Sequence, residues 1–363
     1  MLKYRLLMSA VLLPLFAALF YFDSKSGPLA ALFGPLVMFL SAACAGELVT
    51  MVRNRVPTLT KLDVMLACVT LTFVGWAVHA GPALDWLGSE RAEMGSITRN
   101  GVNPFVPGGI RSIDAAGPIA RLLTGNEIRS APYDQGIRDT PTSVYAAGMV
   151  AAAAILWFGV WLLEAAVRFE KGQLEAGQVV AHVSAKLLVL AYAGGLMAAT
   201  MQMRWFGFSA WASYRLLAGV LIAVKSADIG AYAVGRTLGR RHPLKRLSPG
   251  KTGAGFVGAV VVGGVAFALW MRLMPAREGL RYEDDSLLQF LILTWIGGLL
   301  ALGGVMGDLF ESLLKRECGV KDSSSLIPGF GGVLDVLDSV LFVGAMVVAA
   351  AATVATFSAI ALS

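Results

Sequence analysis

Long apolar runs constrain the fold of this chain more than any other feature of its sequence. We count about nine of them, each close to the roughly 20 residues that an α-helix needs to cross a bilayer. Because a backbone in lipid must satisfy its hydrogen bonds internally, the runs predict an all-α, polytopic integral membrane protein with about nine transmembrane helices. Charged residues make up only 15% of the chain, which agrees with this class. The runs are residues 5–23, 28–50, 63–87, 142–167, 177–200, 213–235, 253–274, 285–312 and 335–361.

The spacing of the runs divides the chain into three parts. Residues 1–87 form an N-terminal membrane region of three helices, and residues 142–363 form a C-terminal catalytic membrane region of six. Between them, the polar residues 88–141 read as an extracytoplasmic insertion. The first run follows Lys3 and Arg5 as in a signal peptide, but no small-residue cleavage site follows Phe22 and Asp23. We therefore interpret it as an uncleaved first span.

The distribution of Lys and Arg predicts the orientation. Short loops on the side of the N-terminus carry more of them than short loops on the other side, which is typical of the cytoplasmic face. We expect a multi-pass protein of the cell (inner) membrane, with the N-terminus and the active site cytoplasmic. The excess of positive charge, +6 over the whole chain, then lies mainly in loops that face anionic lipid. Nucleic-acid binding would require a basic face on a soluble fold, and the sequence shows none. Lys186, inside an apolar run, is expected to snorkel to this surface or to contact a lipid phosphate.

The stretch from Gly307 to Ser339 places acidic residues where two apolar helices meet. Asp308, Ser312 and Lys315 stand at i, i+4 and i+7, so they share one helix face. Asp335 and Asp338, at i and i+3, share another, and the connector SSSLIPGFGG must fold the second helix back on the first. Carboxylates converging beside Lys and Arg predict a divalent-metal and phosphate site. Glu311 lies one turn from Asp308 and could flank the metal, whereas the role of Glu47 stays undecided.

A second polar group lies on the apolar run 213–235, just before residues 236–252, which are rich in Arg and Lys and which we call the basic loop. Lys225, Asp228 and Tyr232 form one polar face of an apolar helix. A charge at the centre of a bilayer costs about 2.5–3.5 kcal/mol, so we expect this face to line a water-filled cavity. The alternative is a structural Lys225–Asp228 pair. The glycines that follow Thr252 match a GxGxxG pattern, but they open an apolar run, and we interpret them as helix-packing positions.

The two polar groups resemble the two conserved regions of the phosphatidate cytidylyltransferase family, also called CDP-diacylglycerol synthases. The first region runs from Asp228 through Gly-Ala-Tyr and two Gly-Arg pairs to Ser248-Pro-Gly-Lys251-Thr252. The second runs from Ser312 through Lys315-Arg316, Lys321-Asp322 and Pro-Gly-Phe-Gly-Gly to Asp338. Four positions depart from the usual pattern: Phe330 stands where the family usually has His, Val336 where it has Arg, Ala254 where it has Glu and Gly253 where it has an aromatic residue.

The resemblance implies a Mg²⁺-dependent reaction of phospholipid biosynthesis, in which CTP and phosphatidate give CDP-diacylglycerol and diphosphate. The expected catalytic residues are Asp308, Ser312, Lys315, Asp335 and Asp338. Of these, Asp308, Asp335 and Asp338 are expected to hold Mg²⁺, and a second cation is left open. The expected substrate-binding residues are Lys225, Asp228, Tyr232, Arg236, Ser248, Lys251, Thr252, Arg316, Lys321 and Asp322.

Other functions stay open at this point. The chain could transfer a cytidylyl group to another polyprenyl or ether lipid, or use CTP as a lipid kinase does. A secondary transporter with a midplane ion site would show inverted sequence halves, and we see none. Small-residue helix faces also leave a homodimer open.

Overall fold

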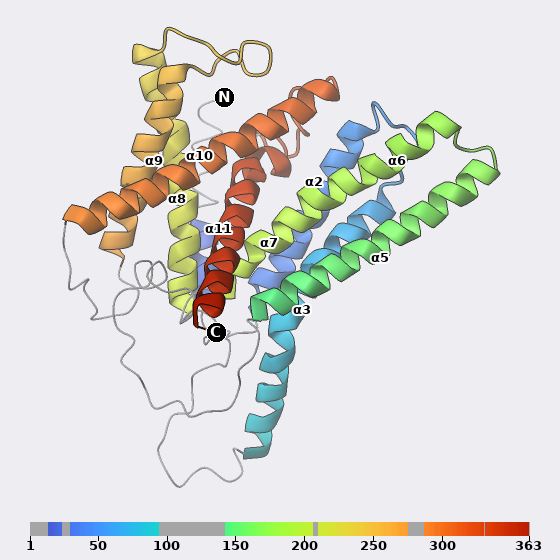
Figure 1. The fold of residues 1–363 in the computed structure, drawn as a ribbon, viewed down its shortest axis with the longest axis horizontal. Coiled ribbons are helices and arrows are strands. Elements are labelled where there is room, and N and C mark those ends of the chain that lie inside the picture. The colour runs from blue at the N-terminus through green and yellow to red at the C-terminus, as the bar shows by residue number, and fades with distance from the viewer. Residues whose placement is uncertain are drawn as a thin grey trace.

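The computed structural model describes residues 14–23, 30–93, 142–205, 210–274, 287–329 and 331–362, and its regular elements in these ranges are helices (Figure 1). A short apolar helix spans Pro14–Asp23. The elements that follow are α2 (Phe33–Val52), α3 (Leu62–Glu93), α5 (Thr142–Glu170), α6 (Ala176–Val189), the π-helix η3 (Leu190–Gly195), α7 (Leu196–Gln202), the 3₁₀-helix η4 (Met203–Trp205), α8 (Ala210–Leu238), α9 (Gly253–Leu273), α10 (Leu287–Glu317) and α11 (Val333–Leu362).

The prediction of a polytopic all-α membrane protein is confirmed. Within the described ranges, eight helical segments are long and apolar enough to cross a membrane, and one of them runs through α6, η3, α7 and η4. The predicted first span begins in residues outside the described ranges, and only its part Pro14–Asp23 is seen, as a helix. Helix α3 continues to Glu93, past the expected start of the polar insertion, and residues 94–141 of that insertion lie outside the described ranges.

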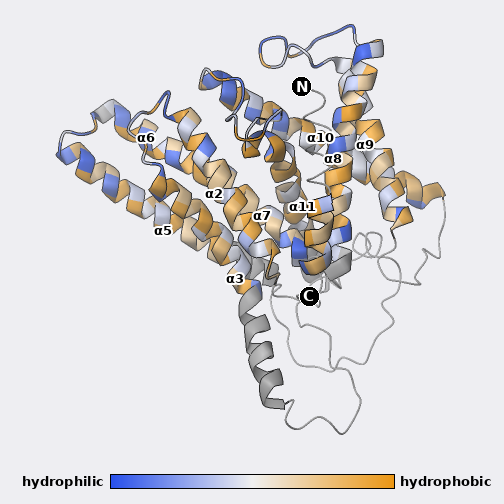
Figure 2. Ribbon diagram, turned by 180° about the vertical axis from the view of Figure 1, so that it is seen from behind, coloured by the Kyte–Doolittle hydropathy of each residue, from blue (hydrophilic) through white to orange (hydrophobic). Residues whose placement is uncertain are grey.

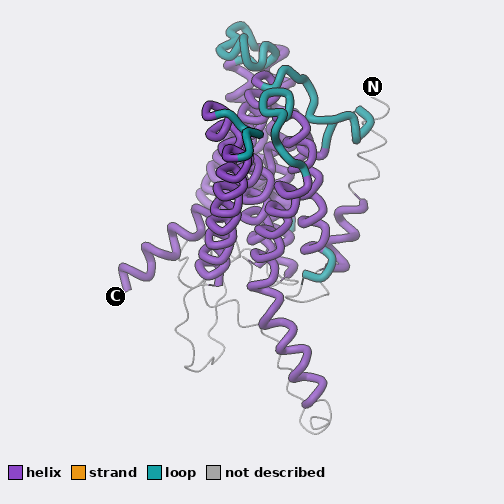
Figure 3. The backbone as a smooth tube through the Cα atoms, turned by 90° about the vertical axis from the view of Figure 1, so that its right-hand side faces the viewer, coloured by secondary structure: helices purple, strands orange, loops and turns teal. Residues whose placement is uncertain are grey.

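The loops that connect α2 to α3, α5 to α6, α8 to α9 and α10 to α11 lie at the same end of the molecule, at the top of Figures 1 and 3. Hydrophilic residues gather at this end, whereas the helix bodies below it are mainly hydrophobic (Figure 2). The arrangement brings both polar regions of the sequence to one end, which we call the polar end.

Glycines allow α8 and α9 to approach closely. A Cβ added at Gly230 would lie 2.5 Å from the carbonyl oxygen of Gly258, and one added at Gly258 would lie 2.6 Å from the carbonyl oxygen of Gly230. The contact is therefore reciprocal, and a side chain on either residue would force the helices apart. The interpretation of this glycine pattern as a packing motif is confirmed at Gly258 and at Gly255, where an added Cβ would lie 2.9 Å from Ala231 O. At Gly253 the space is open.

Helices α3, α5 and α6 share a buried ionic group near the polar end. Lys186 is fully buried, and its Nζ lies 2.5 Å from Asp63 Oδ2 and also contacts Glu164 Oε2. The prediction that Lys186 snorkels or meets a lipid phosphate is wrong. Two carboxylates on neighbouring helices neutralise the amine inside the bundle, where an unpaired charge would be strongly unfavourable.

Substituting Gly230 tests the importance of the α8–α9 contact. We expect Gly230→Ala to lower the free energy of unfolding by about 1–3 kcal/mol, because the added methyl group overlaps the backbone of α9. Gly159→Ala is the matched control, since nothing lies within 4 Å of a Cβ at that helical position. Thermal unfolding of the detergent-solubilised protein measures both, and equal stability of the two variants would contradict the contact.

Candidate active site

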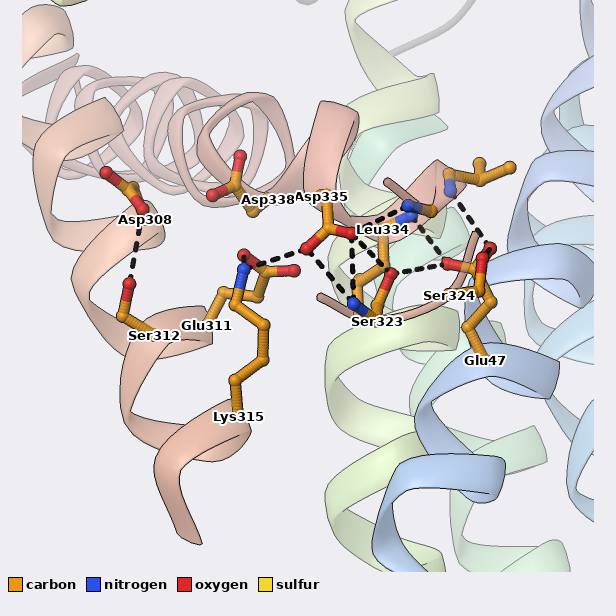
Figure 4. A network of polar contacts seen from close by, with 12 residues as sticks. Glu47, Asp308, Glu311, Ser312, Lys315, Ser323, Ser324, Leu334, Asp335 and Asp338 are labelled. Atoms are coloured by element: carbon orange, nitrogen blue, oxygen red, sulfur yellow. Dashed lines mark hydrogen bonds and ion pairs between the residues drawn. The ribbon is translucent and has the colours of Figure 1, made fainter. Parts of the chain in front are cut away.

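A close crossing of α10 and α11 places three carboxylates at one point of the polar end. A Cβ at Gly307 would lie 2.7 Å from Asp338 O and 3.0 Å from Ser339 Cα, so only glycine permits this approach. The next residue on α10 is Asp308. One carboxylate oxygen from each of Asp308, Glu311 and Asp338 falls within 4.8 Å of the others (Figure 4). We call these three residues the acid cluster.

The acid cluster is buried and incompletely hydrogen-bonded. Glu311 is 1% exposed and Asp338 is 5% exposed, whereas Asp308 is partly exposed. Among the described residues, no donor reaches Glu311 Oε1, although this atom is buried. Leaving a buried charged oxygen without a partner is costly, and hard oxygen atoms in this arrangement are suitable ligands for Mg²⁺. The residues present therefore fit a divalent cation.

Two lysines compensate part of the negative charge. Lys315 Nζ lies 2.5 Å from Glu311 Oε2 and 2.8 Å from Asp335 Oδ1, so it joins α10 to α11. Lys251, which precedes α9, lies 2.5 Å from Asp308 Oδ2. The basic loop, which carries Lys251, therefore contacts the acid cluster directly. Ser312 donates a long hydrogen bond of 3.4 Å to Asp308, as expected for residues on one helix face.

Asp335 lies beside the acid cluster and has other partners. Its Oδ2 accepts hydrogen bonds from the amide groups of Gly332, at 2.6 Å, and Ser323, at 3.0 Å. Its Oδ1 pairs with Lys315. The geometry therefore places Glu311, and not Asp335, with Asp308 and Asp338. The assignment of Asp335 as a metal ligand stays a prediction that these contacts do not support, because both oxygens are engaged in holding the connector and Lys315.

Glu47, whose role the sequence left undecided, is hydrogen-bonded to the same connector as Asp335. It is 8% exposed on α2, and it accepts hydrogen bonds from the connector between α10 and α11 and from the first residues of α11 (Figure 4). The only signal in the sequence is an acidic residue inside an apolar run. That signal gives no partner, since the groups it binds lie 276 or more residues away.

Aromatic side chains pack next to the acid cluster. The ring of Tyr192, from the π-helix η3, lies 5.3 Å from that of Phe310 and 6.3 Å from that of Phe342. Phe310 precedes Glu311 on α10, and Phe342 lies one turn beyond Asp338 on α11. The cluster is therefore bordered on one side by a layer of aromatic rings.

The remaining predicted site residues lie around the cluster at the polar end. Lys225 Nζ and Asp228 Oδ2 are 3.6 Å apart, so the two residues form an ion pair, and both side chains are about half exposed. Tyr232 accepts a hydrogen bond of 2.7 Å from Arg236, and both are exposed. Ser248 is partly exposed on the basic loop, and Arg316, Lys321 and Asp322 are exposed at the end of α10 and on the connector.

Thr252 has a structural explanation. Its side chain is buried and accepts a hydrogen bond of 3.0 Å from Gly255 N, which caps the N-terminus of α9. Its predicted contact with substrate stays a prediction. Of the four departures, Val336, Gly253 and Ala254 are partly buried, and Phe330 lies outside the described residues.

Comparison with known proteins identifies the family. Residues 129–354, more than half of the chain, match the sequence profile of the Cytidylyltransferase family. The chain belongs to the cytidylyltransferase family. The matched range contains the acid cluster, the basic loop and the connector, but it excludes α2 and α3.

Curated relatives include the phosphatidate cytidylyltransferases of Haemophilus influenzae, Pseudomonas aeruginosa and Bacillus subtilis. The first is 42% identical over 124 residues, the second 41% over 124 and the third 38% over 122. Each alignment covers 34% of this chain, and 41%, 42% and 42% of the respective relative. Each alignment thus spans only about two fifths of the relative's own length.

Removing Lys315 tests the charge balance of the site. We expect Lys315→Met to lower the free energy of unfolding by about 3–5 kcal/mol, because it leaves Glu311 and Asp335 buried without their cation. Arg316→Met, next along the chain and exposed, should change it by less than about 0.5 kcal/mol. Thermal unfolding compares the two variants. A Lys315→Met protein as stable as Arg316→Met would show that the lysine does not stabilise these carboxylates.

Proposed function

We propose that this cytidylyltransferase family member is a phosphatidate cytidylyltransferase, which joins CTP and phosphatidate into CDP-diacylglycerol and releases diphosphate. The main support for the proposal is the buried acid cluster, which lies at the polar end of a membrane bundle next to Lys251 of the basic loop. We call the Lys and Arg residues of this loop, Arg236 included, the cationic rim. The names of the relatives support the choice of substrates. The excess of Lys and Arg in the loops of the polar end supports a cytoplasmic site in the cell (inner) membrane, where CTP is available.

Asp308, Glu311 and Asp338 are the residues that would hold Mg²⁺. When bound there, the ion would neutralise charge on the triphosphate of CTP. Its fit rests on the hard oxygen donors and on the buried Glu311 oxygen that has no partner in the described structure. Whether a second cation joins it depends on how far Lys315 and Lys251 already balance the acids.

The chain's own groups bind and orient the two substrates. A phosphatidate oxygen attacks the α-phosphorus of CTP, the bond from that phosphorus to the bridging oxygen of the β-phosphate breaks, and diphosphate leaves. No protein nucleophile is needed, so positioning and charge stabilisation supply the catalysis. Lys251 stands at the mouth of the site beside Asp308, where it would bind phosphate oxygens. The exposed cations at the end of α8 and on the loop before α9 are Arg236, Arg240, Arg241, Lys245 and Arg246.

Lys225, Asp228 and Tyr232 would form the wall next to this rim, with Ser248, Arg316, Lys321 and Asp322 at its edge. Arg246 and Arg316 are exposed at the polar end and would replace the cationic contribution that Val336 does not supply. Because phosphatidate stays in the bilayer, its head group must enter from the side, between helices. The proposed homodimer draws no support from Gly258 and Gly230, whose faces pack within the chain.

A labelling experiment tests the reaction. Protein in lipid nanodiscs is given Mg²⁺, phosphatidate and CTP that carries radioactive phosphorus at the α or the γ position. We expect α-label in the extracted lipid and γ-label in diphosphate. Label from the γ position in lipid would identify a kinase instead, and a panel of polyprenyl and ether-lipid phosphates would reveal another acceptor. Transfer to none of these lipids would contradict the proposal.

The same assay tests the acid cluster. Asp308→Asn should reduce the rate about 10²–10³-fold, as removal of one charge-stabilising group typically does. Glu170→Gln, an exposed acid at the end of α5, is the matched control and should retain full activity. Full activity of Asp308→Asn would contradict the metal assignment.

A further inference from the structure

Helix α2 lies outside the range that matches the family profile, yet it contributes a buried carboxylate to the site. Glu47 accepts four hydrogen bonds from two segments. Its Oε1 accepts from Ser324 Oγ at 2.7 Å and from Val333 N at 3.0 Å. Its Oε2 accepts from Ser323 Oγ at 2.9 Å and from Leu334 N at 2.9 Å. Figure 4 shows the carboxylate of Glu47 beside Ser323, Ser324 and Leu334.

These bonds cap the N-terminus of α11 and also hold the connector that precedes it. Val333 and Leu334 are the first two residues of α11, so their amide groups have no carbonyl partner within the helix. A negative charge at this end is also favoured by the helix dipole. Gly332 completes the arrangement, because a Cβ there would collide with Ser323 Oγ and Glu47 Oε2. The connector closes on Glu47 because residue 332 has no side chain.

A continuous set of contacts leads from Glu47 to the acid cluster. The hydroxyl of Ser323 donates to Glu47, and the amide of the same residue donates to Asp335 Oδ2 at 3.0 Å. Asp335 Oδ1 pairs with Lys315, and Lys315 pairs with Glu311. Glu47 therefore reaches a member of the acid cluster through three residues, each of which makes a direct polar contact with the next.

We propose that Glu47 is a positioning residue, which holds the connector and the start of α11 so that Lys315 and the acid cluster keep the geometry of a divalent-cation site. The proposal rests on the proposed function of that cluster. Residues that orient metal ligands without touching the metal typically change metal affinity or activity about 10–100-fold when replaced. Glu47 is expected to act in this way from a helix distant in sequence.

Glu47→Gln is the sharpest substitution, because it keeps the shape of the side chain. One oxygen becomes an NH₂ group, which donates and cannot accept. Whichever way the amide is turned, this group faces the N–H of Val333 or of Leu334, and the cap is broken on one side. Thr50→Ala is the matched control on the same helix, since Thr50 is exposed and donates to Gly46 O within α2.

The main readout is Mn²⁺ binding to the purified protein without CTP, measured by electron paramagnetic resonance. We expect Glu47→Gln to weaken Mn²⁺ binding about 10–100-fold and to raise the metal concentration needed for CTP turnover by a similar factor. Thr50→Ala should bind Mn²⁺ as the unmodified chain does. A folded Glu47→Gln protein with unchanged Mn²⁺ affinity would overturn the proposal.

Two serines on the connector provide a second test, which also decides the matter if Glu47→Gln does not fold. Ser323 contacts both Glu47 and Asp335, whereas Ser324 contacts Glu47 and the nearby amide of Leu326. Ser323→Ala should therefore weaken Mn²⁺ binding more than Ser324→Ala. Equal effects of the two substitutions would contradict a route through Asp335.

The failure of the proposed function gives a different pattern. Mn²⁺ binding that depends on Glu47, without transfer of α-label to any lipid, would overturn the transferase activity and support the positioning role. An unmodified chain that binds no Mn²⁺ would overturn the positioning role together with the metal site.

Discussion

The burial of carboxylates at one end of a membrane bundle is the constraint on which the rest of this structure depends. Ionised oxygens inside a protein are tolerated only when cations or hydrogen-bond donors face them. Here Lys315 and Lys251 reach the acids from α10 and from the loop before α9. Gly307 lets α10 and α11 cross closely enough to bring Asp338 into the same group. One buried oxygen, Glu311 Oε1, still lacks a partner in the described structure, which is where the proposed cation gains its stabilisation.

The site combines residues inside the range that matches the family profile with one residue that lies outside it. The acid cluster, the basic loop and the connector lie in the range that matches the family profile, whereas Glu47 precedes it. A carboxylate on α2 nevertheless caps α11 and fixes the connector. The N-terminal region is therefore part of the architecture of the site as well as of the membrane bundle. A matched motif alone would not reveal this dependence.

The sequence predicts those parts of the structure that local rules determine. Apolar run length locates the helices, and helical spacing places Ser312 next to Asp308. Contacts between distant helices are beyond such rules. Local spacing also puts Glu311 one turn from Asp308, but nothing local shows that Asp335 turns toward Lys315 and the connector, or that Lys186 has two acidic partners. Each of these outcomes depends on which helix packs against which, and a single sequence does not contain that information in a form that spacing reveals.

We propose that Asp308, Glu311 and Asp338 together bind one divalent cation at the polar end. An anomalous difference map from crystals of the protein grown with Mn²⁺ and a non-hydrolysable CTP analogue tests it most directly. We expect one strong peak within coordination distance of an oxygen from each of the three residues, next to the triphosphate. A peak held by Asp335 without Glu311, or a nucleotide bound with no metal between these carboxylates, would contradict it.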